Sequence, residues 1–395
     1  MQILALALAA LAFPGDAVTL KNGKTVEGRV VRDTAREVVV RVGSQDKRFG
    51  ADEVLLVSSQ ARKLEELLAQ WDACPSGDVG AVRNLARECR ARGLDGEARV
   101  FALLGLTLDG ADAALHELAG HERRGEGWRV RSGSKREDFD KRAARTLDWG
   151  DAWEFETTHF AVRSNLALRE AVGCAVELEL VYRAFFAWFE DELPLHEPVT
   201  AITAHVHADS ASFPEASGRL AYFDPRANVL HVNAAQRLDI GALVHEAVHA
   251  LLHNTSSNTK AALGAVPAWL DEGLAEYLPS CRYGELARGV FTAGQRNEAH
   301  FARHRSAEKP YDLGRVLTFD SGDFAASSQS DLKYSQAYTL THFCLHSSPE
   351  QRTQFFEFFR RAFAGHGSAT DFKSAFELNE RKFEAAWREY VLRSR

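Results

Sequence analysis

The spacing of hydrophobic residues changes along the chain and divides it into parts. Residues 18–58 contain short runs of alternating hydrophobic and polar residues, separated by turn-forming residues. The pair Asn22-Gly23 between two such runs is a strong hairpin signal. We therefore predict a small SH3-like β barrel here. Such modules more often hold a partner than catalyse a reaction.

The hydrophobic spacing becomes helical over residues 60–120, where for example Leu64, Leu67 and Leu68 fall on one helix face. The pattern is not sustained as a repeat, so we expect a helical connector rather than a solenoid. Residues 121–150 are rich in charged residues and contain glycines. This composition favours a solvated, charged linker.

Strand and helix patterns are mixed over residues 155–395. Phe155–Ser164 and Val199–His207 alternate as half-buried strands, and the turn Asp224-Pro225-Arg226-Ala227 separates two further strand-like runs. Helical spacing dominates after Pro349. The sequence therefore predicts an α+β fold with a mixed sheet and a helical C-terminal part.

Composition narrows the functions that the chain can have. Its 395 residues are 45% hydrophobic, enough to bury more than one core. The formal net charge of -7, with no dense basic run, argues against nucleic acid and anionic membranes as partners. The five cysteines show no CxxC spacing, so we expect isolated thiols or one disulfide that the sequence cannot assign.

The first residues resemble a signal peptide. Ile3–Phe13 is apolar, and Gly15 and Ala17 are small residues at the positions that signal peptidase reads. We expect residues 1–17 to direct export to an extracytoplasmic (periplasmic or secreted) location, with no transmembrane segment after their removal. The segment lacks Lys and Arg before the apolar run, so a buried N-terminal segment is the alternative.

A His-Glu-x-x-His motif carries the candidate chemistry. His245 and His249 are four residues apart on a predicted helix, so both rings can bind one metal ion, with Glu246 beside them. Catalytic zinc needs a third protein ligand and an open fourth position. Glu272, on a second predicted helix over Pro267–Leu278, fits that role. We therefore predict one Zn²⁺ per chain.

Other polar residues near these motifs are weaker candidates. Glu276, one turn after Glu272, could accept the second ring N–H of a ligating histidine, unless it is a solvated helix carboxylate. His253 is excluded as a ligand, because eight positions along a helix rotate a side chain by about 80°. His205 and His207 share a strand face, but no carboxylate pair is near them in sequence, so a second metal is not expected.

Two motifs of this chain resemble those of the gluzincins, zinc peptidases whose third ligand is a glutamate on a second helix. Within them, the chain is most similar to the peptidase-MA-like group of bacterial extracytoplasmic proteins, whose second helix reads W-L-x-E-G-x-A-E-Y. The motifs here are His245-Glu246-Ala247-Val248-His249 and Trp269-Leu270-Asp271-Glu272-Gly273-Leu274-Ala275-Glu276-Tyr277. The resemblance covers residues 155–395. It implies a zincin-like metallopeptidase domain, with zinc on His245, His249 and Glu272 and Glu246 as general base.

The resemblance also implies roles outside the two motifs. Tyr334 is similar in position to the tyrosine that stabilises the oxyanion in related aminopeptidases, although Ala337 stands where those enzymes have Gly. Tyr338 in that role, or a Tyr334 that only packs, are the alternatives. The strand residues Ala221, Tyr222 and Phe223 would form the sheet edge that pairs with an extended substrate. An edge strand without a ligand is the alternative.

The sequence thus predicts an exported zinc metallopeptidase that hydrolyses peptide bonds in peptides or proteins by a zinc-activated water. The N-terminal barrel would bind a cell-envelope or protein partner. Two alternatives remain open at this point: a catalytically inactive, peptidase-like binding or scaffold protein, and a zinc hydrolase of another amide or acyl bond.

Overall fold

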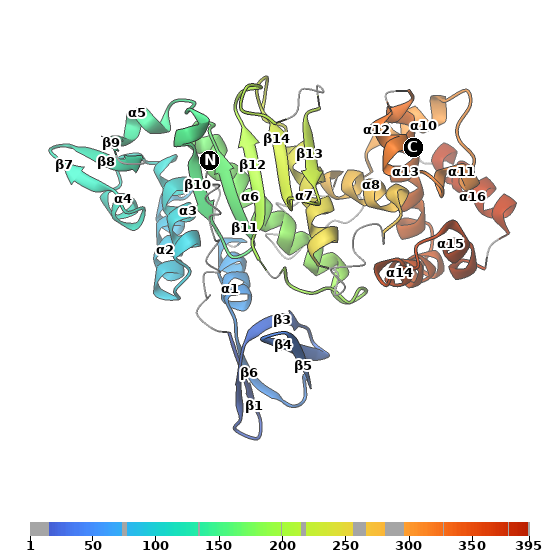
Figure 1. Cartoon of the computed structure of the whole chain (residues 1–395), viewed down its shortest axis with the longest axis horizontal. Helices are drawn as coiled ribbons and strands as arrows, with labels where there is room; N and C mark the ends of the chain where they lie inside the picture. Colours follow the sequence, from blue (N-terminus) through green and yellow to red (C-terminus); the bar gives the residue numbers. More distant parts are fainter. Residues whose placement is uncertain are drawn as a thin grey trace, which may run out of the picture. The chain divides into compact units, whose positions relative to one another are not determined.

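The chain folds into two compact units of mixed α and β structure, residues 1–66 and 67–395 (Figure 1). The computed structural model describes residues 16–72, 77–132, 135–198, 200–214, 219–255, 266–280, 296–326, 328–377 and 379–393. The predicted signal segment lies outside these residues except for Asp16 and Ala17. No helix in the described ranges is long and apolar enough to cross a membrane.

The first unit contains two three-stranded antiparallel sheets. One has the order β2-β1-β6 and the other the order β3-β4-β5. The strands are β1 (Ala17–Leu20), β2 (Thr25–Glu27), β3 (Arg29–Asp33), β4 (Glu37–Val42), β5 (Gln45–Gly50) and β6 (Val54–Ser58). Both sheets contribute buried valines to one core, among them Val18, Val30 and Val40. The predicted Asn-Gly hairpin is confirmed: it joins β1 to β2, and Gly23 has the positive φ of 84° that this turn requires.

The first unit begins before the predicted boundary at residue 17. The Asp16 carboxylate accepts hydrogen bonds from the backbone N–H groups of Val30 (3.0 Å) and Gln60 (3.2 Å). Ala17 already pairs with Glu27 in the neighbouring strand. Removal of residues 1–17 on export stays a prediction.

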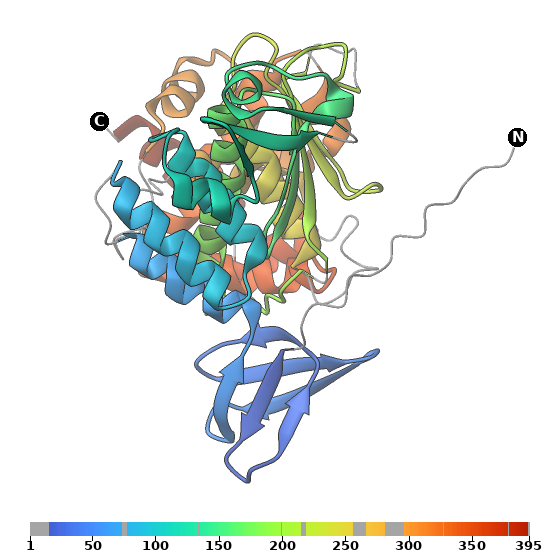
Figure 2. The ribbon, with the colours of Figure 1, turned by 90° about the vertical axis from the view of Figure 1, so that its left-hand side faces the viewer.

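Helices occupy the range predicted to be a helical connector. They are α1 (Gln60–Asp72), α2 (Val79–Ala91), α3 (Asp95–Leu106) and α4 (Ala113–Leu118). In the second unit, α2 and α3 lie side by side (Figure 2). Asp78 and Asp112 cap α2 and α4 by accepting hydrogen bonds from backbone N–H groups of the first turn.

The charged linker predicted over residues 121–150 is not what the structure shows. This range forms a three-stranded sheet of β7 (Glu122–Arg124), β8 (Gly127–Ser132) and β9 (Lys135–Asp138), followed by α5 (Phe139–Ala143) and η1 (Trp149–Asp151). Val130 and Phe139 are buried, and the charged side chains pair across the strands, as Arg136 does with Glu122 at 2.5 Å. The prediction was wrong because these strands consist largely of charged residues and have few apolar positions to show an alternating pattern.

A mixed five-stranded sheet with the order β10-β11-β12-β14-β13 forms the centre of the second unit. Its strands are β10 (Trp153–Glu156), β11 (Phe160–Ser164), β12 (Ile202–His207), β13 (Ala221–Asp224) and β14 (Val229–Asn233). The three inner strands are parallel and the two outer strands are antiparallel to them, which confirms the predicted hairpin of β13 and β14. Helices α6 (Leu168–Phe189) and α7 (Ile240–Asn254) pack on the sheet (Figure 1).

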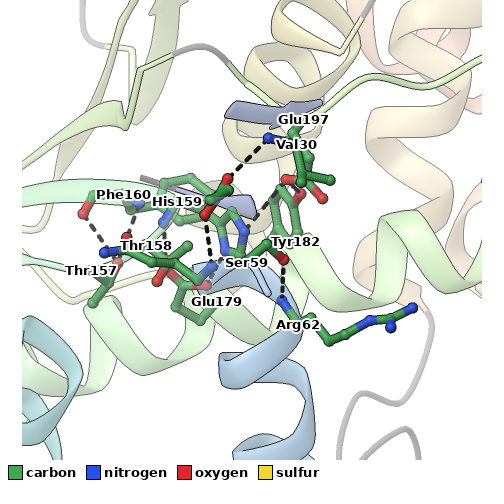
Figure 3. A network of polar contacts seen from close by, with 12 residues as sticks. Val30, Ser59, Arg62, Thr157, Thr158, His159, Phe160, Glu179, Tyr182 and Glu197 are labelled. Carbon is green, nitrogen blue, oxygen red and sulfur yellow. Dashed lines mark hydrogen bonds and ion pairs between the residues drawn. The ribbon is translucent and has the colours of Figure 1, made fainter. Parts of the chain in front are cut away.

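A buried polar network fixes the loop before β11 to α6 (Figure 3). His159 Nδ1 donates to Glu179 at 2.6 Å, its ring stacks on Tyr182 at 3.5 Å, and the Tyr182 hydroxyl donates to Glu197. Burial alone would lower the pKa of His159. Attraction to Glu179, the hydrogen bond to it and attraction to Glu197 overcome this and raise the pKa to about 10.

The C-terminal half of the second unit is helical. Its elements are α8 (Ala268–Tyr277), η2 (Leu278–Ser280), α10 (Glu298–Ser306), α11 (Leu313–Val316), α12 (Ser321–Ala325), α13 (Ser330–His346), α14 (Pro349–Phe363), α15 (Ala369–Ala375) and α16 (Glu380–Arg393). Helices α8 and α13 approach each other closely at Gly273. A Cβ atom there would lie 2.7 Å from the carbonyl oxygen of Ala337 and would also meet Thr341.

Candidate metal centre

Helix α7 presents the first half of the site. Asp239 caps the helix by accepting a hydrogen bond from the Ala242 N–H at 3.2 Å. One turn separates His245 from His249, and their Nε2 atoms lie 3.1 Å apart. Because the two imidazole nitrogens lie this close together, the helix could supply two ligands for one ion.

Helix α8 brings Glu272 to the same position. Its Oε2 atom lies 3.3 Å from His245 Nε2 and 3.4 Å from His249 Nε2. This oxygen is buried and has no hydrogen-bond partner among the described residues, which is costly unless another ligand satisfies it. Ligands about 2.0 to 2.1 Å from a tetrahedral zinc ion lie about 3.3 to 3.4 Å from one another. The three residues therefore fit zinc, with one position left open.

Carboxylates hold the outer nitrogens of the two histidines. Asp271 accepts the hydrogen bond of His249 Nδ1 at 2.8 Å. A carboxylate only accepts, so His249 carries a proton on Nδ1, and its neutral form has the lone pair on Nε2, as a ligand requires. Glu276 Oε1 lies 3.5 Å from His245 Nδ1, and its other oxygen accepts a hydrogen bond from His300 Nε2 at 3.0 Å.

The pKa values of two glutamates of the site, Glu272 and Glu246, are shifted in opposite directions. Burial alone would raise the pKa of Glu272, but attraction to His249 and polar contacts with both imidazoles lower it to about 2. Glu272 is thus ionised, as a metal ligand must be. Burial raises the pKa of Glu246, whose residue surface is only 8% exposed. The two carboxylates are therefore suited to different tasks.

A large cleft of about 1600 Å³ opens over these residues. The predicted edge residues Ala221, Tyr222 and Phe223 line it and belong to β13, the outermost strand of the five-stranded sheet. The cleft is also lined by His245, Glu246, His249, Asp271, Glu272, Glu276, Phe319, Asp320, Phe324 and Tyr334. An extended chain therefore has room to lie between the edge strand and the candidate metal ligands.

Tyr334 and Tyr338 lie one turn apart on α13 but in different surroundings. Tyr334 lines the cleft, and its ring centroid is 6.2 Å from that of His245. Burial and the negative charges of the nearby glutamates raise its pKa, so its hydroxyl stays protonated. Tyr338 is fully buried, and its hydroxyl accepts a hydrogen bond from the Asn297 N–H at 2.8 Å. The geometry thus favours Tyr334 over Tyr338 as a donor to a substrate.

Sequence reasoning missed three residues that the structure brings to metal-ligand positions or beside them. Asp271 stands at the variable position of the second motif, so only its adjacency to Glu272 could have suggested it. His300 is on α10 and reaches Glu276 through tertiary packing alone. His231, on β14, joins His205 and His207 in a second group of potential ligand atoms within the described residues. The available signal was a histidine at an alternating position of a later strand.

Comparison with known proteins gives the limits of one family match in this chain but no function. A family described as "Protein of unknown function (DUF1570)" matches residues 239–364. This range starts at the cap of α7 and ends directly after α14. It contains His245, His249, Glu272 and Tyr334, whereas His205, His207 and His231 lie before it. No curated protein matches the chain.

Proposed function

We propose that the second unit is a zincin-like hydrolase domain that cleaves peptide bonds. The observation that carries this proposal is the buried Glu272 oxygen without a hydrogen-bond partner in the described chain, facing two imidazole nitrogens at 3.3 and 3.4 Å. His245, His249 and Glu272 would hold zinc. When bound, zinc supplies Lewis-acid chemistry, because it polarises a carbonyl group and makes water a stronger acid.

The residues around the ligands divide the remaining work. Glu246, in the same cleft, accepts the proton that an attacking water loses and returns it to the leaving amine. The neutral Tyr334 hydroxyl donates a hydrogen bond to the oxyanion that develops on the substrate. Asp271 and Glu276 hold the rings of His249 and His245 in their ligating orientation.

The edge strand β13 gives the proposed substrate its chemical class. A peptide added beside β13 would gain backbone hydrogen bonds that do not depend on the identity of its side chains. An extended peptide or protein segment therefore fits the cleft better than a compact small molecule. Cleavage of another amide or acyl bond would use the same residues. The type of bond that is cleaved is therefore decided by the experiment.

We also propose export and a binding role for the first unit. The apolar residues 3–13, followed by the small residues Gly15 and Ala17, support a signal segment over residues 1–17. The two small sheets of the first unit support an SH3-like barrel. A partner in the cell envelope, or another protein, would bind there.

The test compares the zinc-loaded full chain with its Glu246→Gln variant on a peptide library, with products identified by mass spectrometry. We expect cleavage by the wild type and a loss of about 10²- to 10⁴-fold in the variant, because Gln cannot accept the proton. Glu308→Gln, at an exposed position, is the matched control and should keep full activity.

Three outcomes separate the candidate functions. Cleavage of acyl substrates but not of peptides would identify a deacylase. Equal activity of the wild type and the Glu246→Gln variant would exclude the proposed mechanism. A chain that binds zinc but cleaves neither class of substrate would be a binding or scaffold protein.

A further inference from the structure

A second group of histidines lies on the five-stranded sheet. His205 and His207 are alternate residues of β12, and His231 is directly opposite His205 on β14. One ring nitrogen of each residue lies within 4.8 Å of those of the other two. None of the three is among the described residues that line the cleft. We propose that this cluster binds a second metal ion, a divalent transition metal such as Zn²⁺ or Cu²⁺, independently of any hydrolysis at the cleft.

Hydrogen bonds around His207 leave a lone pair facing the cluster. The Ser212 hydroxyl donates its only proton to the Asp209 carbonyl at 3.1 Å, so it accepts from His207 Nδ1 at 3.3 Å. His207 therefore presents an unprotonated Nε2, 3.2 Å from His231 Nδ1. A ligating histidine commonly gives its other N–H to such an acceptor. The separation is also close to the 3.1 Å between the ring nitrogens of the pair on α7.

His205 supplies the third ligand position. Its ring contacts the rings of Trp149, His207 and His231, but it makes no hydrogen bond to any residue that the structure describes. A half-buried imidazole without such a partner has a nitrogen lone pair to offer. A metal ion bound by all three rings would give this nitrogen a partner.

Two aromatic side chains hold the rings of the cluster in place. Trp149 stacks on His207 with 4.1 Å between ring centroids, and Tyr222 stacks on His231 at 4.9 Å. The stacked rings fix the directions of the nitrogens before an ion arrives, which lowers the entropy lost on binding. The competing explanation is a metal-free stack in which His231 Nδ1–H donates to His207 Nε2, and the experiment below distinguishes the two.

The charges and the donor atoms select the class of ion. Arg163, opposite His205 on β11, is the adjacent cation, and its ion pair with Glu154 at 3.3 Å offsets its charge. Asp209 adds a negative charge beside His207. Burial lowers the pKa of His205 and His207 to about 4, which is consistent with neutral rings at pH 7. Imidazole donors favour Zn²⁺, Cu²⁺ or Ni²⁺, whereas Ca²⁺ and Mg²⁺ take oxygen ligands.

The experiment measures zinc per chain by elemental analysis, after the metal-free full chain has been reloaded with zinc and desalted. We expect about two ions in the wild type, about one in His205→Phe, about one in Glu272→Ala and none in the double variant. Phe keeps the ring contacts of His205 and removes only the nitrogens. His366→Phe, at an exposed histidine, controls for surface binding and should keep both ions.

The proposal is overturned if His205→Phe keeps the zinc content of the wild type while Glu272→Ala loses all of it. A second measurement avoids substitutions in the sheet. In the Glu272→Ala chain, we expect Zn²⁺, but not Mg²⁺, to protect His205, His207 and His231 from modification by diethylpyrocarbonate, as mapped by mass spectrometry. Equal modification with and without Zn²⁺ would leave the metal-free ring stack as the explanation. Neither result depends on whether the cleft has hydrolytic activity.

Discussion

The two candidate metal clusters of the second unit use histidine in different ways. On α7 and α8, two imidazoles and a carboxylate could share one ion, and all three face a cleft of about 1600 Å³. On β12 and β14, three imidazoles lie between the rings of Trp149 and Tyr222. The first arrangement leaves space for a substrate beside the ion. The second encloses the ion with aromatic rings, which suits a structural or regulatory ion better than a reaction.

The comparison shows that the surroundings of a ligand set, rather than the ligands alone, indicate its use. Both clusters have a pair of ring nitrogens 3.1 to 3.2 Å apart, and in both an oxygen acceptor binds an outer nitrogen. The helix cluster (His245, His249 and Glu272) has two further glutamates in its cleft, Glu246 and Glu276, and Glu276 already accepts a hydrogen bond from His300. A proton acceptor and an open volume are what hydrolysis adds to metal binding.

The most severe test of the comparison removes the carboxylate ligand of the helix cluster. For Glu272→Ala we expect zinc affinity at this cluster to fall by more than about 100-fold, the upper end of the loss seen for outer-shell residues. Hydrolysis should disappear with the ion. Isothermal titration with zinc would measure both clusters at once. An unchanged affinity in both would show that Glu272 is not a ligand.

Tyr334→Phe separates catalysis from metal binding within the helix cluster. Loss of one oxyanion donor should lower kcat by about 10²- to 10³-fold, with zinc content unchanged. Tyr338→Phe is the matched control, because Tyr338 is fully buried and is not among the described residues that line the cleft. Steady-state kinetics on a cleaved peptide would decide. If both variants have the same kcat as the wild type, Tyr334 only packs.

The outer shells of the two clusters provide the next comparison. Asp271→Asn should lower zinc affinity at the helix cluster by about 10- to 100-fold, because the amide is a weaker acceptor for His249 Nδ1–H. Ser212→Ala should weaken only the strand cluster, and by less, since a hydroxyl polarises an imidazole less than a carboxylate does. Competition with a chelator would measure each effect. Loss of the same ion in both variants would contradict the assignment of two separate sites.

The smallest expected effect is on thermal stability, and it comes from the buried pair of His159 and Glu179. The pKa of His159 is raised to about 10 in the folded chain, above its usual value near 6.5. The ion pair with Glu179 therefore stabilises the fold fully below about pH 6.5, and this contribution is lost as the pH rises through about 10. The unfolding temperature should fall over that range by about 2 to 4 °C per kcal/mol lost. Calorimetry would show a flatter alkaline slope for Glu179→Gln, and an equal slope would contradict the pairing.

Local spacing made the helix cluster predictable. His245, Glu246 and His249 stand within one helical turn, and Glu272 belongs to a second short motif. The residues that complete both clusters come from tertiary structure. His231 meets His205 only through the register of two parallel strands, and His300 reaches Glu276 from a separate helix. Sequence periodicity reports which face of an element is buried, but not which faces of two elements meet.

The fold, like the site, was predictable where local sequence features determine it. The β13–β14 hairpin followed from its turn residues. Asp224 Oδ1 accepts a hydrogen bond from the Arg226 N–H, Pro225 stands between them, and both features are local. The sheet over residues 122–138 did not, because its strands carry charged residues on both faces and bury few side chains. Its exposed ion pair of Arg136 with Glu122 joins the two outer strands across β8, and no single segment displays this contact.

Gly273 has a consequence for anyone who would build this centre into another protein. The close approach of α8 to α13 at this residue sets the distance between the helix that carries Glu272 and the helix that carries Tyr334. A design that copied only α7 and α8 would reproduce the ligands and lose the spacing of the tyrosine. The smallest transferable part is therefore a set of three helices, joined at a position where the required side chain is a hydrogen atom.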